Sequence, residues 1–391
     1  MRILLFSSQI FNILNYALGF SNLDHEFITT PLVPSCKRKE FENKIALFRG
    51  SKLEKLRIFP IFLETSERCF RNYLNPISVT NDLLSIFKAL TYIKPTAIIC
   101  SYVLDALPLV MLKRIFNYSL YVVASGGDVN LHEGILYRLV RKLIYSHSDL
   151  IFAVSNELKH KIQRESGYEA IVIPPGVDPA FFRPLNLKAS LREKWGFKEK
   201  AFVVLTVCEL VKHKGLDIIM KSISISNHRL RDCIKLAIVG EGPEKPALEQ
   251  LASKLNLKEN TIFLGFRSRE ELLELYNLAD LFVLASYSEG MPFVLLEAMA
   301  CGCVCISTNV GDISRAIIDG YNGFLIMSGD PEALAKKIER VLSPQKENIF
   351  SFRNRARSTI LNNFDFRHLI RNMIELISIK ESRLHAKESL N

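Results

Sequence analysis

The segment Leu281–Ser307 reads LFVLASYSEGMPFVLLEAMACGCVCIS and predicts a strand, a helix and a second strand in succession. Its first five residues are apolar and predict a buried strand of a parallel sheet. A glycine and a proline then break the chain before Phe293–Ala300, which predicts a short helix with Pro292 in its first turn. Val304–Ser307 predicts the next strand. Strand, helix and strand in this order are typical of a parallel α/β sheet with right-handed crossovers.

Glu289 and Glu297 flank the start of this predicted helix, with seven residues between them. Glu289 falls in the loop at the carboxyl end of the first strand, and Glu297 falls one turn into the helix. The helix N-terminus between them offers free N–H groups and a positive dipole end, which together bind anions. Carboxylates beside an anion site suit hydroxyl groups rather than the anion itself. Hydroxyls that flank a phosphate are the chemistry of a sugar nucleotide.

Strand and helix patterns alternate along the whole chain of 391 residues, which is long enough for two domains. We therefore expect an α/β protein with two doubly wound, Rossmann-like domains. A proline-rich segment at 174–179 marks the boundary between them. The predicted divisions are a first domain at 1–175, a second at 176–364 and a final segment at 365–391. In that last segment Phe366–Ser378 predicts an amphipathic helix, and the residues from Glu381 onward are expected to be frayed.

The loops after four predicted strands of the second domain hold the candidate site residues. Because ligands of such sheets bind outside the carboxyl ends of the strands, we expect these loops to lie on one edge of one sheet. The loops carry Glu209 and Lys214 after Phe202–Val207, Gly240–Pro243 after Leu236–Val239, Phe266 and Arg267 after Thr261–Leu264, and Glu289 after Leu281–Ala285. A lysine before a helix, followed by a glycine that permits close backbone approach, can reach a diphosphate.

The segment Ser288–Gly302 resembles the E-x7-E motif of retaining GT-B glycosyltransferases of family 4, the glycosyl transferases group 1. Cys208–Gly215 resembles that family's lysine–glycine motif, and Ser125–Asn130 resembles a loop of its first domain. The resemblance runs from about Ala97 to the last helix and is strongest over Lys235–Ile326. It implies the GT-B fold, in which two Rossmann-like domains face a central cleft and the last helix returns to the first domain. In this fold the first domain, 1–175, would bind the acceptor and the second, 176–364, would bind the nucleotide-sugar.

The resemblance also implies roles for individual residues. Glu289 would meet the hydroxyls of the donor sugar, Glu297 the ribose hydroxyls of the nucleotide, and Lys214 the diphosphate. The other residues expected around the nucleotide are Gly240, Gly242, Phe266, Arg267, Gly290, Met291, Pro292 and Phe293. Asp128 is a second catalytic candidate, placed beside the acceptor, although an aspartate at this position equally predicts a helix N-cap. Glu209 stands where the family has an arginine, and Ser125 where a histidine is common.

These features together predict a retaining glycosyltransferase that moves a sugar from a nucleotide-sugar, UDP- or GDP-linked, to a glycan or lipid-linked acceptor. No D-x-D metal motif is present, so we expect neither a metal nor a cofactor, and the helix dipole and Lys214 would neutralise the leaving diphosphate. Cys301, Cys303 and Cys305 are expected to be buried thiols. The alternatives are a non-catalytic nucleotide-sugar-binding protein, left open by Glu209, Ser125 and the missing N-terminal glycine-rich loop of the family, and an epimerase or phosphorylase of the same fold.

The chain carries a net charge of +10, from 51 basic and 41 acidic residues, which favours anionic partners. No nucleic-acid-binding motif occurs, so we expect no nucleic-acid partner. Between Lys37 and Arg57, basic and large apolar residues alternate, a pattern shared by membrane-surface elements and by solvated loops. No uncharged apolar run of about 18 residues and no signal-peptide pattern occurs. We expect a cytoplasmic protein, attached to the inner face of the cell membrane if the Lys37–Arg57 pattern is a membrane element.

Overall fold

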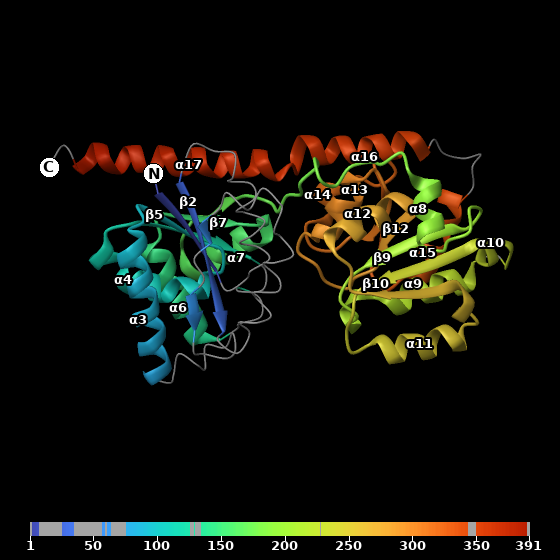
Figure 1. Cartoon of the computed structure of the whole chain (residues 1–391), viewed down its shortest axis with the longest axis horizontal. Coiled ribbons are helices and arrows are strands. Elements are labelled where there is room, and N and C mark those ends of the chain that lie inside the picture. Colours follow the sequence, from blue (N-terminus) through green and yellow to red (C-terminus); the bar gives the residue numbers. More distant parts are fainter. Residues whose placement is uncertain are drawn as a thin grey trace. The chain divides into compact units, whose positions relative to one another are not determined.

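The computed structural model describes residues 2–7, 26–34, 57–58, 61–63, 76–125, 129, 134–226, 228–342 and 349–388. The chain divides into two compact units (Figure 1). One unit comprises Met1–Pro174 together with Arg367–Asn391, and the other comprises Pro175–Phe366. Each unit is built on its own parallel sheet with helices packed against it, which confirms the predicted α/β class.

The sheet of the N-terminal unit has eight strands, and every pairing that the structure describes in it is parallel. Across the sheet the strands are β3 (Arg57–Ile58), β2 (Glu26–Pro34), β1 (Arg2–Ser7), β5 (Ala97–Cys100), β6 (Ser119–Ala124), β7 (Leu150–Ala153) and β8 (Ile171–Val172), with β4 (Ile61–Leu63) paired to β2. The strand order reverses between β1 and β5, where Leu4 lies opposite Ile98.

Four helices and a short 3-10 helix pack on one face of this sheet. They are α3 (Pro76–Ile93), the 3-10 helix η4 (Val103–Ala106), α4 (Leu107–Phe116), α6 (Ile135–His147) and α7 (Asn156–Ser166). Alternate strand residues such as Ile98, Leu120 and Val122 point into the core that these helices share, because side chains alternate between the two faces of a strand. Tyr121, between two of these residues, therefore points to the opposite face.

The last helix, α17 (Phe366–Glu388), covers Tyr121 on that opposite face. The Tyr121 hydroxyl donates a hydrogen bond to the Glu381 carboxylate. Ile370, Met373 and Ile374, on the face predicted to be apolar, are buried. The expectation that the chain frays from Glu381 onward was wrong, because the helix continues to Glu388 and Glu381 itself has a tyrosine partner.

The sheet of the C-terminal unit has six parallel strands. Across the sheet they are β11 (Thr261–Gly265), β10 (Ile234–Val239), β9 (Phe202–Val207), β12 (Leu281–Leu284), β13 (Val304–Thr308) and β14 (Phe324–Ile326). From β9 the chain first builds outward through β10 to β11, and then returns to place β12 on the other side of β9. The sheet therefore has a topological switch point between β9 and β12.

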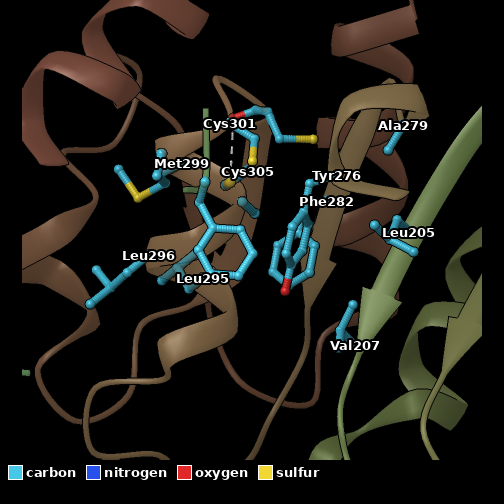
Figure 2. Close-up of a cluster of buried hydrophobic side chains, with 14 of the residues drawn as sticks. Leu205, Val207, Tyr276, Ala279, Phe282, Leu295, Leu296, Met299, Cys301 and Cys305 are labelled. Carbon is cyan, nitrogen blue, oxygen red and sulfur yellow. Dashed lines mark hydrogen bonds between the residues drawn. The ribbon is translucent and has the colours of Figure 1, made fainter. Parts of the chain in front are cut away.

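Helices cover both faces of this sheet, as a doubly wound fold requires. One core unites α8 (Lys188–Lys194), α12 (Arg269–Leu278), α13 (Phe293–Ala300), α14 (Ile313–Ala316) and α16 (Ile349–Asn363) with the sheet. The opposite core unites α9 (Leu216–Ile225), α11 (Lys245–Lys254) and α15 (Pro331–Leu342) with it, and α10 (His228–Cys233) precedes β10. Figure 2 shows the first core, where Tyr276 and Phe282 pack edge to face with ring centroids 5.9 Å apart.

The three predicted buried thiols lie where this core meets the sheet. Cys301, Cys303 and Cys305 are buried free cysteines, as expected. Burial raises the pKa of the Cys303 thiol to about 11, and it raises the pKa values of the other two thiols as well. These thiols are therefore neutral at physiological pH and pack as small apolar side chains. In the part of the chain that the structure describes, no cluster of His, Cys, Asp and Glu is arranged to hold a metal ion.

Candidate functional site

The four loops that the sequence singles out follow β9, β10, β11 and β12, at the carboxyl edge of the C-terminal sheet. The loops after β9 and β12 meet at the topological switch point. These two strands are parallel neighbours, and the chain adds the following strands on opposite sides of the pair. Lys214 ends the 3-10 helix η5 (Lys212–Lys214) after β9, and Glu289 lies between β12 and α13. The switch point therefore brings together a lysine and a glutamate that are 75 residues apart in the chain.

Backbone hydrogen bonds fasten these loops to one another. In each bond a backbone N–H of one loop donates to a carbonyl oxygen at the end of a neighbouring strand or in its loop. The bonds run from Leu210 N to Glu241 O (2.9 Å), from Gly240 N to Gly265 O (2.9 Å), from Tyr287 N to His213 O (2.8 Å) and from Asp312 N to Gly290 O (2.9 Å). These bonds link the ends of five neighbouring strands, β9 to β13, along the carboxyl edge.

Glycines allow the loops to come this close. A Cβ atom on Gly215 would lie 2.0 Å from the Ala285 carbonyl oxygen, and Gly215 has a φ of 63°. A Cβ on Gly240 would lie 1.9 Å from the Cys208 carbonyl oxygen, and one on Gly242 would lie 2.4 Å from a neighbouring backbone oxygen. A side chain at any of these positions would push two strand ends apart. Gly240 and Gly242 thus shape the site through the backbone.

Lys214 and Glu289 form an ion pair at the centre of this edge. The Lys214 Nζ donates to Glu289 Oε1 at 2.7 Å, and the Ser286 hydroxyl donates to the same oxygen at 2.8 Å. The two charged side chains retain only 19% and 10% of their exposure. The candidate diphosphate lysine is therefore held in a partly buried contact with the candidate sugar-binding glutamate.

The residues that depart from the family motif lie just before this pair. Cys208 is near enough to Lys214 and Glu289 for both charges to act on it, but burial dominates and raises the pKa of its thiol to about 12. Cys208 is therefore a neutral neighbour of the ion pair. The side chain of Glu209 is exposed, in contrast to the buried Leu210 that follows it.

Glu297 lies in the core rather than on the surface of the site. It retains 7% of its exposure, and its Oε2 accepts a hydrogen bond of 2.9 Å from the hydroxyl of Tyr276. Burial raises the pKa of the Glu297 carboxyl, while the tyrosine hydrogen bond and the charge of Arg269 act against the rise. Tyr276 is itself wholly buried, and its pKa lies well above its ordinary value. It is therefore a neutral donor that orients the Glu297 carboxylate.

Arg267 and Arg269 are anchored by contacts within the C-terminal unit. The Arg267 guanidinium lies 5.3 Å from the Trp195 ring centroid and donates to Glu271 Oε1 at 3.0 Å. Arg269 stacks 4.8 Å from the ring centroid of Phe181. Phe266 directly follows β11 and precedes these two arginines in the chain. It is 77% exposed, and its ring faces solvent.

The remaining predicted residues lie either just before α13 or in the segment after β6 of the N-terminal unit. Gly290, Met291 and Pro292 lead into α13: Pro292 precedes its first residue, Phe293, and Met291 packs into the core. Asp128 lies outside the described residues. Ser125 directly follows β6, and its buried hydroxyl has no hydrogen-bond partner within the described ranges.

Three supporting residues were not found from the sequence. Ser286 and Tyr276 hold the two glutamates, and Trp195 packs against Arg267. Ser286 could have been suspected, because it lies three residues before Glu289 in the same loop. Tyr276 and Trp195 carry no such signal, since only the packing of α8 and α12 against the sheet brings them to the site.

Comparison with solved structures defines the class of this fold. Sucrose-phosphate synthase from Thermosynechococcus elongatus has a TM-score of 0.79 at 18% identity, over 98% of this chain and 100% of that chain. Alr3699/HepE of Anabaena, solved in complex with UDP, has a TM-score of 0.77 at 18% identity, over 97% of this chain and 100% of that chain. These neighbours are GT-B glycosyltransferases, so the chain has the GT-B fold.

Residues 188–359 match the family Glycosyl transferases group 1, and the C-terminal unit therefore contains a domain of this family. The chain is 35% identical over 182 residues to D-inositol 3-phosphate glycosyltransferase of Acidothermus cellulolyticus, covering 44% of this chain and 40% of that protein. It is 29% identical over 234 residues to a GDP-mannose-dependent phosphatidylinositol monomannoside mannosyltransferase of Mycolicibacterium smegmatis, covering 57% and 61%. The matches span about half the length of these curated relatives.

Proposed function

We propose that this chain is a glycosyltransferase that moves a sugar from a nucleotide-sugar, UDP- or GDP-linked, to a glycan or lipid-linked acceptor with retention of configuration. The observation that carries this proposal is the Lys214–Glu289 ion pair at the switch point of the C-terminal sheet. A cation for a diphosphate and a carboxylate for sugar hydroxyls lie 2.7 Å apart there. They adjoin the N-terminus of α13, whose dipole favours an anion.

The proposed chemistry uses these groups in separate roles. Lys214 and the α13 N-terminus neutralise the charge that develops on the leaving diphosphate. Glu289 accepts hydrogen bonds from donor-sugar hydroxyls, and Glu297 accepts them from the ribose. The departing phosphate oxygen takes the proton from the acceptor hydroxyl as the new glycosidic bond forms on the same face of the sugar. We expect the transfer reaction to need no divalent metal, because the chain lacks a D-x-D motif.

The first test is a thermal-shift screen of the full chain with UDP-, GDP- and ADP-linked sugars. We expect one nucleotide class to raise the melting temperature, since a ligand present at about 100 times its Kd stabilises the folded state by about 2.7 kcal/mol. If no nucleotide sugar stabilises the protein, the proposal fails. Activity that EDTA abolishes and magnesium or manganese restores would contradict the metal-free chemistry alone.

A sharper test uses Glu289→Gln with the nucleotide diphosphate that the screen selects. The substitution removes the charge that competes for Lys214, so we expect the bare diphosphate to bind as tightly as in the wild type or several-fold more tightly. Turnover of the nucleotide sugar should fall strongly, because the sugar loses its carboxylate contact. Lys214→Ala is the matched variant and should weaken both diphosphate binding and turnover. Wild-type turnover in Glu289→Gln would exclude this site.

A non-catalytic nucleotide-sugar-binding protein is the second candidate. One observation favours it: Glu209, where the family has an arginine, brings an acid to a loop that would face a diphosphate. The two candidates share the binding step and differ in turnover. Binding of the selected nucleotide sugar, without hydrolysis or transfer to any glycan or lipid-linked acceptor, would support this second function.

A further inference from the structure

The outer surface of the N-terminal helix layer is unusually apolar. Ten large hydrophobic side chains are exposed among the described residues of the N-terminal unit, and nine of them lie on α3, α4 and α6. We call this surface the α3–α4–α6 face. Its apolar residues are Leu84, Phe87, Tyr92, Met111, Ile115, Ile135, Leu136, Leu139 and Leu143.

The three helices form one continuous surface. α4 packs beside both α3 and α6, and Figure 1 shows the three helices side by side. The rings of Phe87 and Phe116 meet edge to face at 5.1 Å and close the seam between α3 and α4. On α6, Ile135, Leu139 and Leu143 recur every four residues and so form one stripe along the helix. Ile135 is 79% exposed.

The charged side chains that the structure describes on this face are all positive. α3 from Leu83 onward, α4 and α6 contain no Asp or Glu. Lys88, Arg114, Arg138 and Lys142 are exposed among the apolar side chains. Arg138 also lies 3.9 Å from Glu165, but 57% of its side chain stays exposed. The other two cations of these helices are paired at the back of the layer, Lys113 with Asp149 at 2.6 Å and Arg141 with Glu165 at 2.7 Å.

The neighbouring helix α7 shows that this composition is not general to the layer. α7 packs beside α6 in the same core, and its exposed residues are Asn156, Glu157, His160, Gln163 and Arg164. All five are polar, and one is acidic. The apolar and cationic character therefore stops at the edge of α6.

We propose that the α3–α4–α6 face docks on an anionic lipid surface. Apolar side chains enter the boundary between headgroups and acyl chains, and the surrounding cations pair with lipid phosphates. A second copy of this chain would set cation against cation on such a face. A nucleic acid would leave nine apolar side chains without a partner. Among the described helices, none is long and apolar enough to cross a membrane, so the contact proposed is peripheral.

This proposal goes beyond the proposed transferase function and does not depend on it. It also differs from the sequence-based expectation, which assigned membrane contact to Lys37–Arg57. That stretch lies outside the described residues except for the backbone of Arg57. The two candidate surfaces can be separated by mutation, because they share no residue.

The test is vesicle flotation of the full chain. We expect flotation with phosphatidylcholine vesicles that contain phosphatidylglycerol, and little with phosphatidylcholine alone. Ile135→Ser/Leu139→Ser/Leu143→Ser should lower partitioning by about tenfold or more even at low salt, because the apolar contribution is lost. Arg138→Glu/Lys142→Glu should also lower it, since each cation near an anionic surface contributes about fivefold.

Matched controls keep the test independent of folding and net charge. Lys254→Glu/Lys336→Glu makes the same charge change on exposed positions of the C-terminal unit and should float like the wild type. All variants should keep the wild-type melting temperature, because the altered side chains are exposed. The proposal fails if the wild type ignores anionic vesicles, or if the triple serine variant floats as well as the wild type. It fails equally if sedimentation shows a dimer that the triple variant abolishes, since the face would then bind a second copy.

Discussion

The Glu297 carboxyl is surrounded by core side chains, and at the scale of single residues its ionisation is the unusual feature of this site. Burial disfavours the carboxylate and raises the pKa, while the Tyr276 hydroxyl partly compensates by donating a hydrogen bond. A buried acid whose pKa is raised weakens the folded state as it ionises. Two variants separate a role of this carboxyl in stability from a role in nucleotide binding.

Tyr276→Phe removes the hydroxyl that orients Glu297. We expect a loss of about 1–3 kcal/mol in the free energy of unfolding, because a buried acceptor loses its donor. Nucleotide affinity should fall as well, because the carboxylate is no longer held toward the ribose. Tyr118→Phe is the control. Tyr118 and Leu109 both lie in the N-terminal unit, and the substitution removes a buried hydrogen bond of 2.5 Å from the Tyr118 hydroxyl to the Leu109 carbonyl. It should cost stability and leave nucleotide affinity unchanged; equal affinities in both variants would refute the positioning role.

Glu297→Gln removes the ionisation. Because the folded pKa lies above the ordinary value of 4.5, the stability that the neutral acid contributes is present at lower pH and is lost as the pH rises through the folded pKa. The variant should therefore gain stability over the wild type near neutrality, and this advantage should shrink toward pH 4.5. Thermal unfolding at several pH values measures it. An advantage independent of pH would contradict the raised pKa.

The same position also bears on the ligand. Glu297→Ala should weaken nucleotide binding by roughly 1.5–3 kcal/mol if the carboxylate binds ribose hydroxyls, as expected for hydrogen bonds to a charged group. Titration calorimetry with the selected nucleotide measures the loss. An unchanged Kd would place the ribose elsewhere.

At the scale of elements, the site depends on how closely the strand ends approach one another. Gly215 and Gly320 form a matched pair for this point, because both have a positive φ, 63° and 73°. A Cβ at Gly320 would meet nothing within 4 Å, whereas at Gly215 it would lie 2.0 Å from the Ala285 carbonyl oxygen. Gly320→Ala should cost about 1–2 kcal/mol of stability, the usual penalty for the left-handed conformation. Gly215→Ala should cost clearly more and should also weaken nucleotide binding.

Denaturant unfolding and nucleotide titration of both variants check this prediction. The two variants could instead lose the same free energy of unfolding and have the same nucleotide Kd as each other. The contact between the β9 and β12 loops would then not be what positions Lys214.

At the scale of the whole molecule, the C-terminal unit is one continuous piece of chain, and the N-terminal unit is not. Pro175–Phe366 has its own two cores, and its ends are joined inside the unit, where Val177 N donates to Phe364 O at 2.9 Å and Phe366 N donates to Val177 O at 3.1 Å. All candidate nucleotide contacts lie within this piece.

We therefore expect the fragment Pro175–Phe366 to unfold cooperatively by itself and to bind the selected nucleotide with an affinity close to that of the full chain. It should transfer no sugar, because the family resemblance places the acceptor on the first predicted domain, 1–175. Differential scanning calorimetry and titration of the fragment decide this. A fragment that is folded but does not bind would show that the N-terminal unit contributes nucleotide contacts.

The sequence is sufficient to predict the parallel α/β class and the start and end of elements such as β9 and α13, because apolar runs, glycine and proline act locally. It also determined that Lys214 and Glu289 follow strands of one sheet, because parallel strands end on the same edge. Tertiary structure alone decided that β9 and β12 are neighbours, that Lys214 is paired with Glu289, and that Tyr276 holds Glu297 in the core. Those facts depend on strand order and helix packing, which join residues far apart in the chain and leave no periodic trace in the sequence.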